Sequence, residues 1–461
     1  MIKLPSALLP VIDHLVAKKC RPVVVGGYVR DSLLNIPSKD IDIEVFGLKD
    51  LGQLEQLLLP FGKVNSVGKS FGVVKLQQDD TEVDFSLPRQ EKKIARGHKG
   101  FSVTLDGTLS FKEAARRRDF TINAMGYDLV EKKLLDPFNG QDDLKAKRLD
   151  LVDPQTFIED PLRLYRAVQF AARFELTPSK KLLDLGRQMV ETKMLDELPK
   201  ERIFEEFKKL LLKSRRPSVG FALMDELGML NCFPELKALK RLPQDSHCHP
   251  EGDVWTHTMM VLDAMTTLHG EDEKSNLRLS LAALCHDLGK ANTTAFIDGT
   301  ISAIGHENTG IALTQTLLGR MTDEKALVES ILPLVQNHLK PLQFYRRDAE
   351  AAAIRRLANA VNIKELIILA KADFLGRNTE EAGNGRFKAG EWLQERAAAL
   401  NVLEAPLKPL LQGRDLIKAG LAPSTAFKQI LEEAYEAQIE GSICTHQEAI
   451  LWLKELLGND L

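Results

Sequence analysis

The chain has 461 residues, of which 44% are hydrophobic and 28% are charged, and its formal net charge at pH 7 is −3. At roughly 150 residues per domain, this length predicts two to four domains, each large enough to bury a core. The small net charge excludes a uniformly basic surface, so an RNA ligand would have to bind to local basic patches.

The five cysteines are scattered without a CxxC pair, which excludes a disulfide framework and a zinc ribbon and is typical of the reduced cytosol. The first 20 residues lack the long apolar core and the cleavage site of a secretory signal, and no run of roughly 18 apolar residues occurs. We therefore expect a cytoplasmic protein that does not contact a membrane.

The N-terminal part of the chain has the short strands, glycine turns and few helices of an α/β domain. We expect a head over residues 1–150 that consists of a small mixed β-sheet with helices. Its expected elements are a helix over 1–20, a strand, turn and helix start over 21–34, an alternating strand over 39–47, and further strands over 69–77 and 81–89.

Apolar residues at the three- and four-residue spacings of helices dominate the remainder. The helical pattern over 159–235 is followed by a loop rich in Pro, His and Asp over 242–253, and helices resume over 254–400 and after Gly413. We therefore expect an all-α remainder in three parts, a neck over 151–240, a domain over 241–400 and a tail over 401–461.

Two carboxylates lie in the alternating strand of the head. Because alternate residues of a strand face the same side, Asp40 and Asp42 should project together. Such a pair can hold Mg²⁺, which prefers oxygen ligands and binds nucleotide phosphates. A third carboxylate is expected on a neighbouring strand, where Asp84 is our choice and Glu82 shares its face.

A glycine turn precedes this strand. Gly26 and Gly27 let backbone N–H groups approach a phosphate, and Arg30 adds a charged donor on the helix that follows. Alone, the glycines would indicate a simple turn and the two aspartates an exposed strand face. Together, at this spacing, they predict phosphoryl transfer.

Three motifs in a fixed order support this hypothesis. The segment GGYVRD at 26–31 with KDIDI at 39–43 is followed by RRDFTINA at 117–124 and EDPLR at 159–163. In these motifs the chain resembles the class II tRNA nucleotidyltransferases, or CCA-adding enzymes, and the bacterial poly(A) polymerases. The resemblance covers nearly the whole chain and implies tRNA, CTP and ATP as partners.

The resemblance also implies a role for individual residues. Mg²⁺ would be bound by Asp40 and Asp42, with Asp84 as the third catalytic carboxylate. The triphosphate would contact Gly26, Gly27 and Arg30, and the nucleotide and its sugar would contact Arg118, Asp119 and Asn123. The incoming base would be recognised by Asp160 and Arg163.

The last of these roles is chemically sensible by itself. An Arg fork and a carboxylate one helical turn apart offer donors beside acceptors, and Asp160 with Arg163 could pair with cytosine or adenine. The alternative is a plain helix salt bridge. Arg166 shares their face and would reach phosphate, whereas Gln169 stands where some relatives carry arginine, which puts one nucleotide contact in doubt.

A basic segment at 89–118 carries nine Lys or Arg against three Asp or Glu. The resemblance implies a flexible segment that helps to switch specificity from CTP to ATP, and its full length disfavours an enzyme that adds only CC. The usual acidic pair before RRD is incomplete, because Ala114 follows Glu113. From the residues alone, two interpretations of this segment are about equally supported. It is either a solvated charged face or a surface that contacts phosphate or the RNA backbone.

A second set of polar residues lies in the helical domain. His286 and Asp287 end an apolar helix, where burial is costly unless such groups are paired or bind a metal. With His257, His306, His338 and Asp373 they offer the ligands of a transition metal.

The order of these residues resembles the HD phosphohydrolase domain. His257, His286, Asp287 and Asp373 match its H…HD…D pattern, and His306 and His338 match the extra ligands of the two-metal form. The resemblance implies a divalent metal such as Ni²⁺, Mn²⁺ or Co²⁺ and hydrolysis of phosphate esters, with Lys290 near the substrate phosphate. The alternative is an HD fold that serves as an RNA-binding body. His247 and His249 are interpreted as loop residues, with a metal role as the minority view.

Three functions remain in competition. The favoured one is addition of CCA to tRNA, with an HD domain that hydrolyses 2′,3′-cyclic or 3′ phosphates at RNA ends. The second is a poly(A) polymerase or an enzyme that adds only CC or only A. The HD domain and the mixed charge of the tail disfavour the poly(A) polymerase. The third is an HD hydrolase or tRNA-binding module with an inactive head. The sequence leaves monomer and homodimer open.

Overall fold

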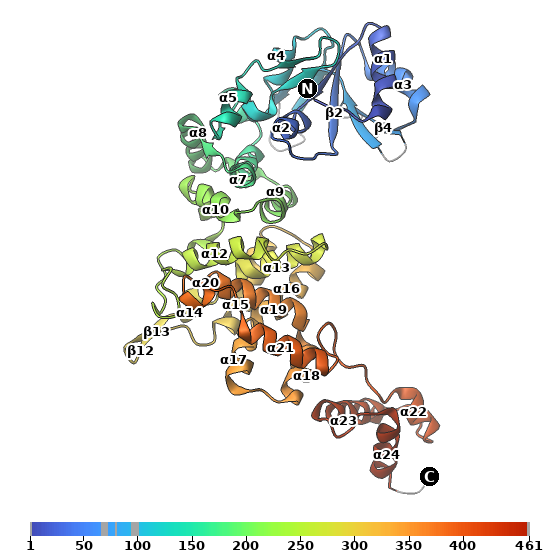
Figure 1. Ribbon diagram of the computed structural model, residues 1–461, viewed down its shortest axis with the longest axis vertical. Helices are drawn as coiled ribbons and strands as arrows, with labels where there is room; N and C mark the ends of the chain where they lie inside the picture. The colour runs from blue at the N-terminus through green and yellow to red at the C-terminus, as the bar shows by residue number, and fades with distance from the viewer. Residues whose placement is uncertain (1, 66–71, 79–80, 94–100, 459–461) are drawn as a thin grey trace. The chain divides into compact units, whose positions relative to one another are not determined.

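The computed structural model describes residues 2–65, 72–78, 81–93 and 101–458. The chain divides into two compact units, which Figure 1 shows as ribbons. The first unit comprises Met1–Ser214 and Val219–Met229, and the second comprises Arg215–Ser218 and Leu230–Leu461.

The first unit begins with a seven-stranded sheet, which confirms the mixed sheet expected for the head. Among the described strands of this sheet, β2 and β5 are the parallel neighbours, and each other neighbouring pair is antiparallel. In sheet order the strands are β3 (Lys63–Asn65), β4 (Val73–Gln78), β5 (Thr81–Ser86), β2 (Ile41–Phe46), β1 (Arg21–Val25), β8 (Gly126–Asp128) and β9 (Lys133–Leu135).

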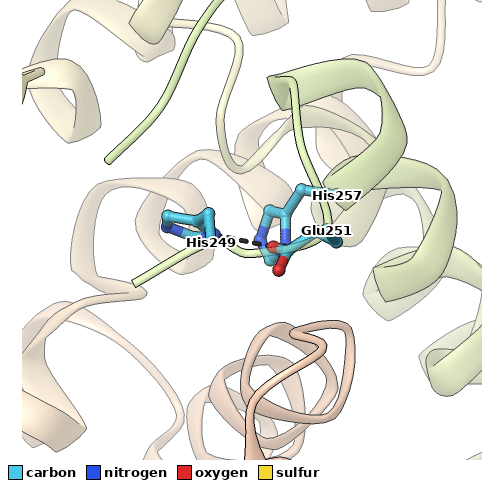
Figure 2. Close-up of side chains that lie close together, drawn as sticks. All are labelled: His249, Glu251 and His257. Atoms are coloured by element: carbon cyan, nitrogen blue, oxygen red, sulfur yellow. Dashed lines mark hydrogen bonds and ion pairs between the residues drawn. The ribbon is translucent and has the colours of Figure 1, made fainter. Parts of the chain in front are cut away.

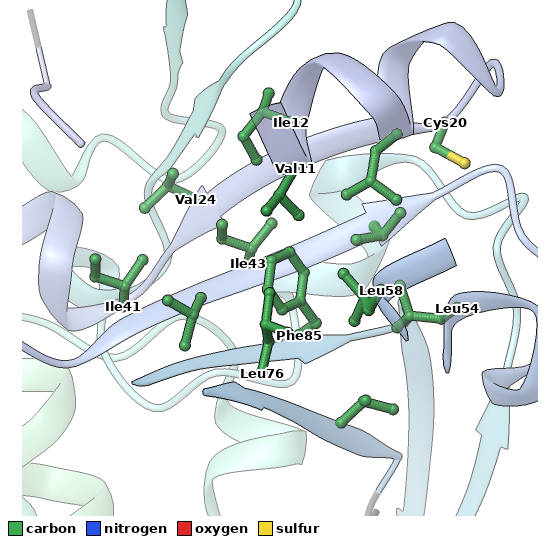
Figure 3. Packing of buried hydrophobic residues seen from close by; sticks show 14 of the residues in the cluster. Val11, Ile12, Cys20, Val24, Ile41, Ile43, Leu54, Leu58, Leu76 and Phe85 are labelled. Carbon is green, nitrogen blue, oxygen red and sulfur yellow. The ribbon is translucent and has the colours of Figure 1, made fainter. Parts of the chain in front are cut away.

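One face of this sheet carries the main core of the head. Helices α1 (Leu9–Ala17) and α3 (Leu51–Leu58) lie on that face, and Figure 3 shows their apolar side chains meeting those of the strands. Phe85 and Ile43 are both fully buried there. Because strand side chains alternate, Asp42 and Asp84 fall on the opposite face, away from this core.

The expected alternation in β2 is wrong beyond Asp42, because Glu44 and the residues on either side of it are all buried. The second face of the sheet is covered by α4 (Phe111–Ala115), whose Phe111 packs against Phe46. Apolar and polar residues alternate along a strand only where one face is buried and the other is exposed, so this alternation is lost where both faces are buried.

Helices complete the first unit. They include α2 (Gly27–Leu33), α5 (Gly140–Lys145), α6 (Pro154–Phe157), α7 (Leu162–Phe174), α8 (Lys180–Glu191), α9 (Lys200–Lys213) and α10 (Pro217–Glu226). Helices α7 and α9 pack together, with the rings of Tyr165 and Phe207 6.1 Å apart. The basic segment contains a hairpin of β6 (Arg89–Lys93) and β7 (Phe101–Leu105), and residues 94–100 lie outside the described part.

The second unit is mainly helical. Its larger part contains α11 (Pro234–Lys237), α12 (Val254–Thr266), α13 (Glu273–Cys285), α14 (Lys290–Thr293), α15 (His306–Gly319), α16 (Lys325–Asn337), α17 (Lys340–Arg347), α18 (Ala351–Ala360), α19 (Ile363–Leu375), α20 (Glu380–Gly383) and α21 (Lys388–Ala399). Helix α13 packs against α12, α16 and α19. The expectation of an all-α remainder is wrong at the hairpin of β12 (Ala295–Ile297) and β13 (Thr300–Ser302), because Gly299 between them adopts the positive φ that a tight turn needs.

The tail forms α22 (Gly413–Lys418), α23 (Ala426–Glu440) and α24 (His446–Leu456), which enclose a small apolar cluster. Helix α23 is attached to α18, where Tyr435 donates a hydrogen bond to Asn359 and Arg356 pairs with Glu436. Among the described residues, none of the helices has the length and apolar character needed to cross a membrane.

Replacing Phe85 by Ala should destabilise the head by about 3–5 kcal/mol, because it opens a cavity in the middle of the core. Cys20 belongs to the same core and is 4% exposed, so its reaction with a thiol reagent in increasing urea reports unfolding of the head. We expect Phe85→Ala to lower the urea concentration at which Cys20 reacts. Leu9→Ala, at a site that is 54% exposed, is the control and should leave that concentration nearly unchanged.

Candidate functional site

A cavity of about 490 Å³ lies within the first unit. It brings together residues of the head with residues of α7 and α9. Of the twelve head-site candidates, eleven line it, namely Gly26, Gly27, Arg30, Asp40, Asp42, Arg118, Asp119, Asn123, Asp160, Arg163 and Arg166. The twelfth, Asp84, lies beside this cavity on β5.

The three candidate metal ligands lie close to one another at the edge of the cavity. Asp40 immediately precedes β2, and Asp42 is its second residue. Asp84 is directly opposite Asp42 in the parallel pair of β2 and β5, so the two side chains leave the sheet on the same face. Lys75 on β4 approaches Asp84 to 3.4 Å and Glu82 to 2.5 Å.

The electrostatics around Asp42 fit a divalent cation. Partial removal from water raises the pKa of the Asp42 carboxyl, and the negative charges of Asp84 and Asp40 raise it further, although Arg118 opposes them. Like-charged carboxylates that crowd one site favour the binding of a cation between them. The donor set consists only of oxygens, which suits Mg²⁺.

Both arginines of the RRD motif form ion pairs with a carboxylate that was not predicted from the sequence. Glu44 on β2 is fully buried, and it lies 2.9 Å from Arg117 and 3.8 Å from Arg118. A buried carboxylate needs such partners, because an unpaired charge in the interior is costly. Glu44 therefore holds the two guanidinium groups at the wall of the cavity.

The glycine turn closes one side of the cavity. Gly26 has a φ of +72°, and a Cβ atom there would come within 3.0 Å of Arg118 Nη1. Arg30 lines the cavity but is buried, and it donates hydrogen bonds to Asp31 and Asn123. Its guanidinium also lies 4.5 Å from the centre of the Phe174 ring. Arg30 therefore fixes the junction of head and α7, and its contact with a triphosphate stays a prediction.

Asp119 organises the next part of the wall. Its carboxylate accepts hydrogen bonds from Asn123 at 3.0 Å and from Arg166 at 2.6 Å. Burial alone would raise the pKa of Asp119, but the Arg166 charge and these hydrogen bonds hold it below its usual value. The candidates Asn123 and Arg166 are therefore connected through the ionised carboxylate of Asp119.

The two residues proposed to recognise the base are positioned differently from the sequence prediction. Asp160 precedes α7, which begins at Leu162, so the expectation that both residues lie one turn apart on a helix is wrong. The Asp160 carboxylate accepts a hydrogen bond from the Leu162 N–H and pairs with Arg202 at 3.1 Å. Arg163 donates to the backbone carbonyls of Thr156 and Arg117.

Several cations of the cavity were missed by the sequence analysis. They are Arg173, Arg202 and Lys209, whereas Arg89, which also lines the cavity, belongs to the basic segment already singled out. Arg202 and Lys209 lie on α9, roughly 80 residues beyond the RRD motif, and nothing local in the sequence marks them. Gln169 is buried and lines the same cavity, and its side-chain oxygen has no hydrogen-bond partner among the described residues.

The segment before the RRD motif also has a structural role. Ser110 and Glu113 form a capping box at the start of α4, with Glu113 accepting from the Ser110 N–H at 2.8 Å. Ala114 is fully buried beneath the sheet. A carboxylate at position 114 would be buried in an apolar cluster, which is costly for a charge and gives a structural reason for the incomplete acidic pair.

A second cavity, of about 440 Å³, lies in the second unit and contains a dense cluster of imidazoles and carboxylates. Asp287 occupies its centre. One carboxylate oxygen lies 3.2 Å from His286 Nε2, and the other lies 3.3 Å from His306 Nε2 and 3.9 Å from His338 Nε2. His257 Nε2 lies 3.1 Å from Asp373. All six candidate ligands of the helical domain therefore converge.

The hydrogen bonds of three of these imidazoles fix their tautomers. His286, His306 and His338 each place Nδ1 at 2.7–2.8 Å from the backbone carbonyl three residues earlier. A carbonyl can only accept, so Nδ1 carries the hydrogen in the neutral rings and Nε2 presents its lone pair to the cavity.

This arrangement fits bound metal. The Nε2 atoms of His306 and His338 are 3.2 Å apart, so two lone pairs face each other unless a proton or a metal cation is shared by the two rings. Burial, followed by repulsion from His286 and His306, lowers the pKa of His338 to about 3, which keeps this ring neutral. Nitrogen and oxygen donors together suit a divalent transition metal. Asp287 lies between the group of His306 and His338 and the group of His257, His286 and Asp373.

The sequence analysis missed a carboxylate behind this cluster. Figure 2 shows Glu251 between His249 and His257. One of its oxygens lies 2.8 Å from Nδ1 of each ring, and the other accepts the Asn378 N–H at 3.1 Å. Although burial opposes ionisation, these contacts hold the pKa of Glu251 well below its usual range. Glu251 therefore directs His257 Nε2 toward Asp373.

Cations complete this cavity. Lys290 lies 2.7 Å from Asp287 and donates to Gln244 at 2.7 Å, and Arg377 lies 2.9 Å from Asp373. Burial would raise the pKa of Asp287, but His286 and Lys290 hold it well below its usual range. His249 lines the cavity, so the interpretation of this residue as an ordinary loop histidine is incomplete.

Three family models match successive parts of the chain. A poly A polymerase head domain matches residues 23–150, a probable RNA and SrmB-binding site of polymerase A matches 177–240, and an HD domain matches 254–378. The structure is also similar to the crystal structure of a Bacillus stearothermophilus CCA-adding enzyme in complex with CTP, with a TM-score of 0.69, 20% identity and coverage of 98% of each chain.

Curated relatives agree with the family models. A multifunctional CCA protein of Laribacter hongkongensis is 35% identical over 367 residues, which cover 78% of this chain and 85% of the relative. The multifunctional CCA protein of Pasteurella multocida is 34% identical and covers 77% and 83% of the two chains. On this similarity, together with the two cavities described above, the chain belongs to the family of multifunctional CCA proteins.

Proposed function

We propose that this chain adds cytidine and adenosine nucleotides to the 3′ end of tRNA from CTP and ATP, in the order CCA. The observation that carries the proposal is the cavity of the first unit, in which Asp40 and Asp42 face a wall of arginines. We assign the chemistry to the head, residues 1–150, and base recognition to the neck, residues 151–240. Membership of the family supports both assignments.

The transfer requires attack by the RNA 3′ hydroxyl oxygen on the α-phosphorus of the nucleotide. An O–P bond forms, the bond from the α-phosphorus to the bridging oxygen breaks, and pyrophosphate leaves. Asp40, Asp42 and Asp84 would hold Mg²⁺, which lowers the pKa of the hydroxyl and stabilises charge on the transferring phosphate. Arg118 and Arg166 would neutralise the phosphate groups of the nucleotide, because both line the cavity.

Base recognition would depend on Asp160 and Arg163. The Asp160 carboxylate is held by the Leu162 N–H and by Arg202, and Arg163 is oriented by two backbone carbonyls. These fixed positions offer a hydrogen-bonding edge that cytosine or adenine can satisfy. A guanine or uracil would leave buried polar groups unpaired, which lowers its rate of incorporation.

We further propose that residues 241–400 form a phosphohydrolase that acts on 2′,3′-cyclic and 3′ phosphates at RNA ends. His257, His286, Asp287, His306, His338 and Asp373 would hold one or two divalent transition metals, such as Ni²⁺, Mn²⁺ or Co²⁺. A bound metal lowers the pKa of a water molecule and supplies hydroxide at neutral pH. Lys290 and Arg377 would orient the phosphate, since both line the cavity.

A poly(A) polymerase is the second candidate, because the head matches a family model of that description. Purified protein incubated with Mg²⁺, tRNA transcripts ending before CCA, after C and after CC, and each nucleotide separately distinguishes the two. We expect C, C and A to be added in turn, and Asp42→Asn to abolish addition. Long A tails on every transcript would contradict CCA addition, and no incorporation would indicate an inactive head.

Asp160→Ala and Arg163→Ala should relax the choice between nucleotides by about tenfold or more, because each removes part of the hydrogen-bonding edge. The measurement is kcat/KM for all four nucleotides on transcripts that end after C and after CC. Glu159→Ala is the matched control, because Glu159 does not line the cavity among the described residues. Unchanged selectivity in both variants would refute the assignment of base recognition.

His286→Ala should abolish metal-dependent release of phosphate from 3′-phosphorylated RNA and leave nucleotide addition intact. The reason is that His286 presents Nε2 to Asp287, whereas the head has its own metal ligands. His446→Ala, in the tail, is the control. Equal phosphate release by His286→Ala and the unchanged protein would remove the assignment of hydrolysis to this cavity.

Glu251→Gln should weaken metal binding in the second unit by about 10–100-fold, because the amide no longer holds His257 with a full negative charge. The affinity is measured by competition with a chelator for Ni²⁺, Mn²⁺ and Co²⁺. Glu324→Gln, an exposed carboxylate outside the cavity, is the control. An affinity unchanged by Glu251→Gln would show that Glu251 has no part in positioning His257.

A further inference from the structure

A third cavity adjoins the imidazole cluster of the second unit. Its volume is about 720 Å³, and we call it the α17–α21 groove. Residues of α17, the end of α19 and the start of α21 form it, and the residues that matter here are Tyr345, Arg346, Phe374, Arg377, Arg386 and Phe387. Helices α17 and α21 pack against each other, so the groove belongs to one folded body.

The groove and the metal-ligand cavity share a wall. Cys248, Leu342, Arg346 and Arg377 line both of them. A molecule with its phosphate beside Asp287 would therefore extend past these residues into the groove. The Arg377 guanidinium marks the boundary, because it is paired with Asp373.

Aromatic side chains form the sides of the groove. Phe374 and Phe387 lie against each other with ring centres 5.2 Å apart, and both pack in one apolar cluster. Tyr345 is 40% exposed and is supported at its edge by Trp392, with ring centres 6.1 Å apart. An exposed ring held in place by a second ring is a surface on which a flat base can stack.

The charge of the groove is positive. Arg346, Arg377, Arg386 and Lys388 line it against a single carboxylate, Glu381. Arg386 is paired with Glu391, whereas Arg346 has no ion pair among the residues that the structure describes. Arg346 is also exposed and lies at the shared wall, so its guanidinium is available to a ligand that spans both cavities.

We propose that the α17–α21 groove binds the terminal nucleoside of an RNA 3′ end whose phosphate lies in the metal-ligand cavity. Tyr345 stacks on the base, and Arg346 contacts the ribose and its 3′ phosphate where they pass the shared wall. The proposal rests on the hydrolytic function proposed above and deepens it, because it makes the nucleoside, and not the phosphate alone, the recognised group. A volume of this size accommodates a nucleoside.

The test compares two substrates of the full-length, metal-loaded protein. Adenosine 3′-monophosphate has a base, and glycerol 2-phosphate has none. Tyr345→Ala should raise KM for the nucleotide about tenfold and leave KM for glycerol 2-phosphate unchanged, because base stacking is lost. Tyr345→Phe keeps the ring and should behave as the unchanged protein. An equal change for both substrates, or no change for either, would overturn the proposal.

Arg346 offers a matched pair of variants. Arg346→Ala should raise KM for adenosine 3′-monophosphate at least threefold, and Arg347→Ala should not, because Arg347 lines neither cavity among the described residues. Equal effects of the two variants would show a general loss of positive charge and would overturn the role of Arg346.

A second measurement separates this inference from the hydrolytic function. If the unchanged protein releases phosphate from neither substrate, the proposed hydrolytic function is wrong. Photolabelling with 8-azidoadenosine 3′-monophosphate then tests, without any need for hydrolysis, whether the groove binds a nucleoside. Label in the peptide of residues 340–347, abolished by Tyr345→Ala, supports the groove as a nucleoside site. Label confined to other peptides overturns it.

Discussion

Each of the two cavities contains carboxylates that the protein neutralises only in part. In the head, Asp40, Asp42 and Asp84 have Arg118 and Lys75 nearby, and the pKa of Asp42 is still raised. In the second unit, Asp287 is surrounded by imidazoles, two of which place Nε2 within 3.3 Å of its carboxylate oxygens. The remaining charge is what a divalent cation supplies, so both sites depend on the same electrostatic constraint.

In the second unit, the carbonyl groups at the ends of two helices orient the imidazoles that face Asp287. The last carbonyls of a helix have no partner within it. His286 and His338 follow the last residues of α13 and α16, and their Nδ1 atoms donate to Ala283 and Val335. One hydrogen bond therefore satisfies a helix carbonyl and turns Nε2 toward the cavity. The negative end of the helix dipole also favours a cation there.

The sequence predicted the residues of local motifs well and their distant partners poorly. Asp84 was chosen as a carboxylate on a neighbouring strand, and the register of β2 and β5 places it directly opposite Asp42. Glu44 could not be predicted as the anchor of the RRD arginines, because its partner lies 73 residues further along the chain. Arg202 was missed for the same reason, since only the packing of helices brings it to Asp160. Glu251 is close to His257 in the sequence, but nothing in the loop pattern shows that its carboxylate turns back to His257 Nδ1.

Two errors of prediction have the same origin as these omissions. The strand pattern of β2 fails at Glu44 because α4 covers the second face, and helix α7 begins after Asp160 because that carboxylate accepts the Leu162 N–H. In both places a carboxylate makes its ion pairs with residues of another part of the chain, so its position does not follow the pattern of its own strand or helix. From its place before the helix, the Asp160 carboxylate both pairs with the Arg202 guanidinium and lines the cavity. The strand and helix patterns therefore fail at Glu44 and Asp160 because both carboxylates hold cations of the site.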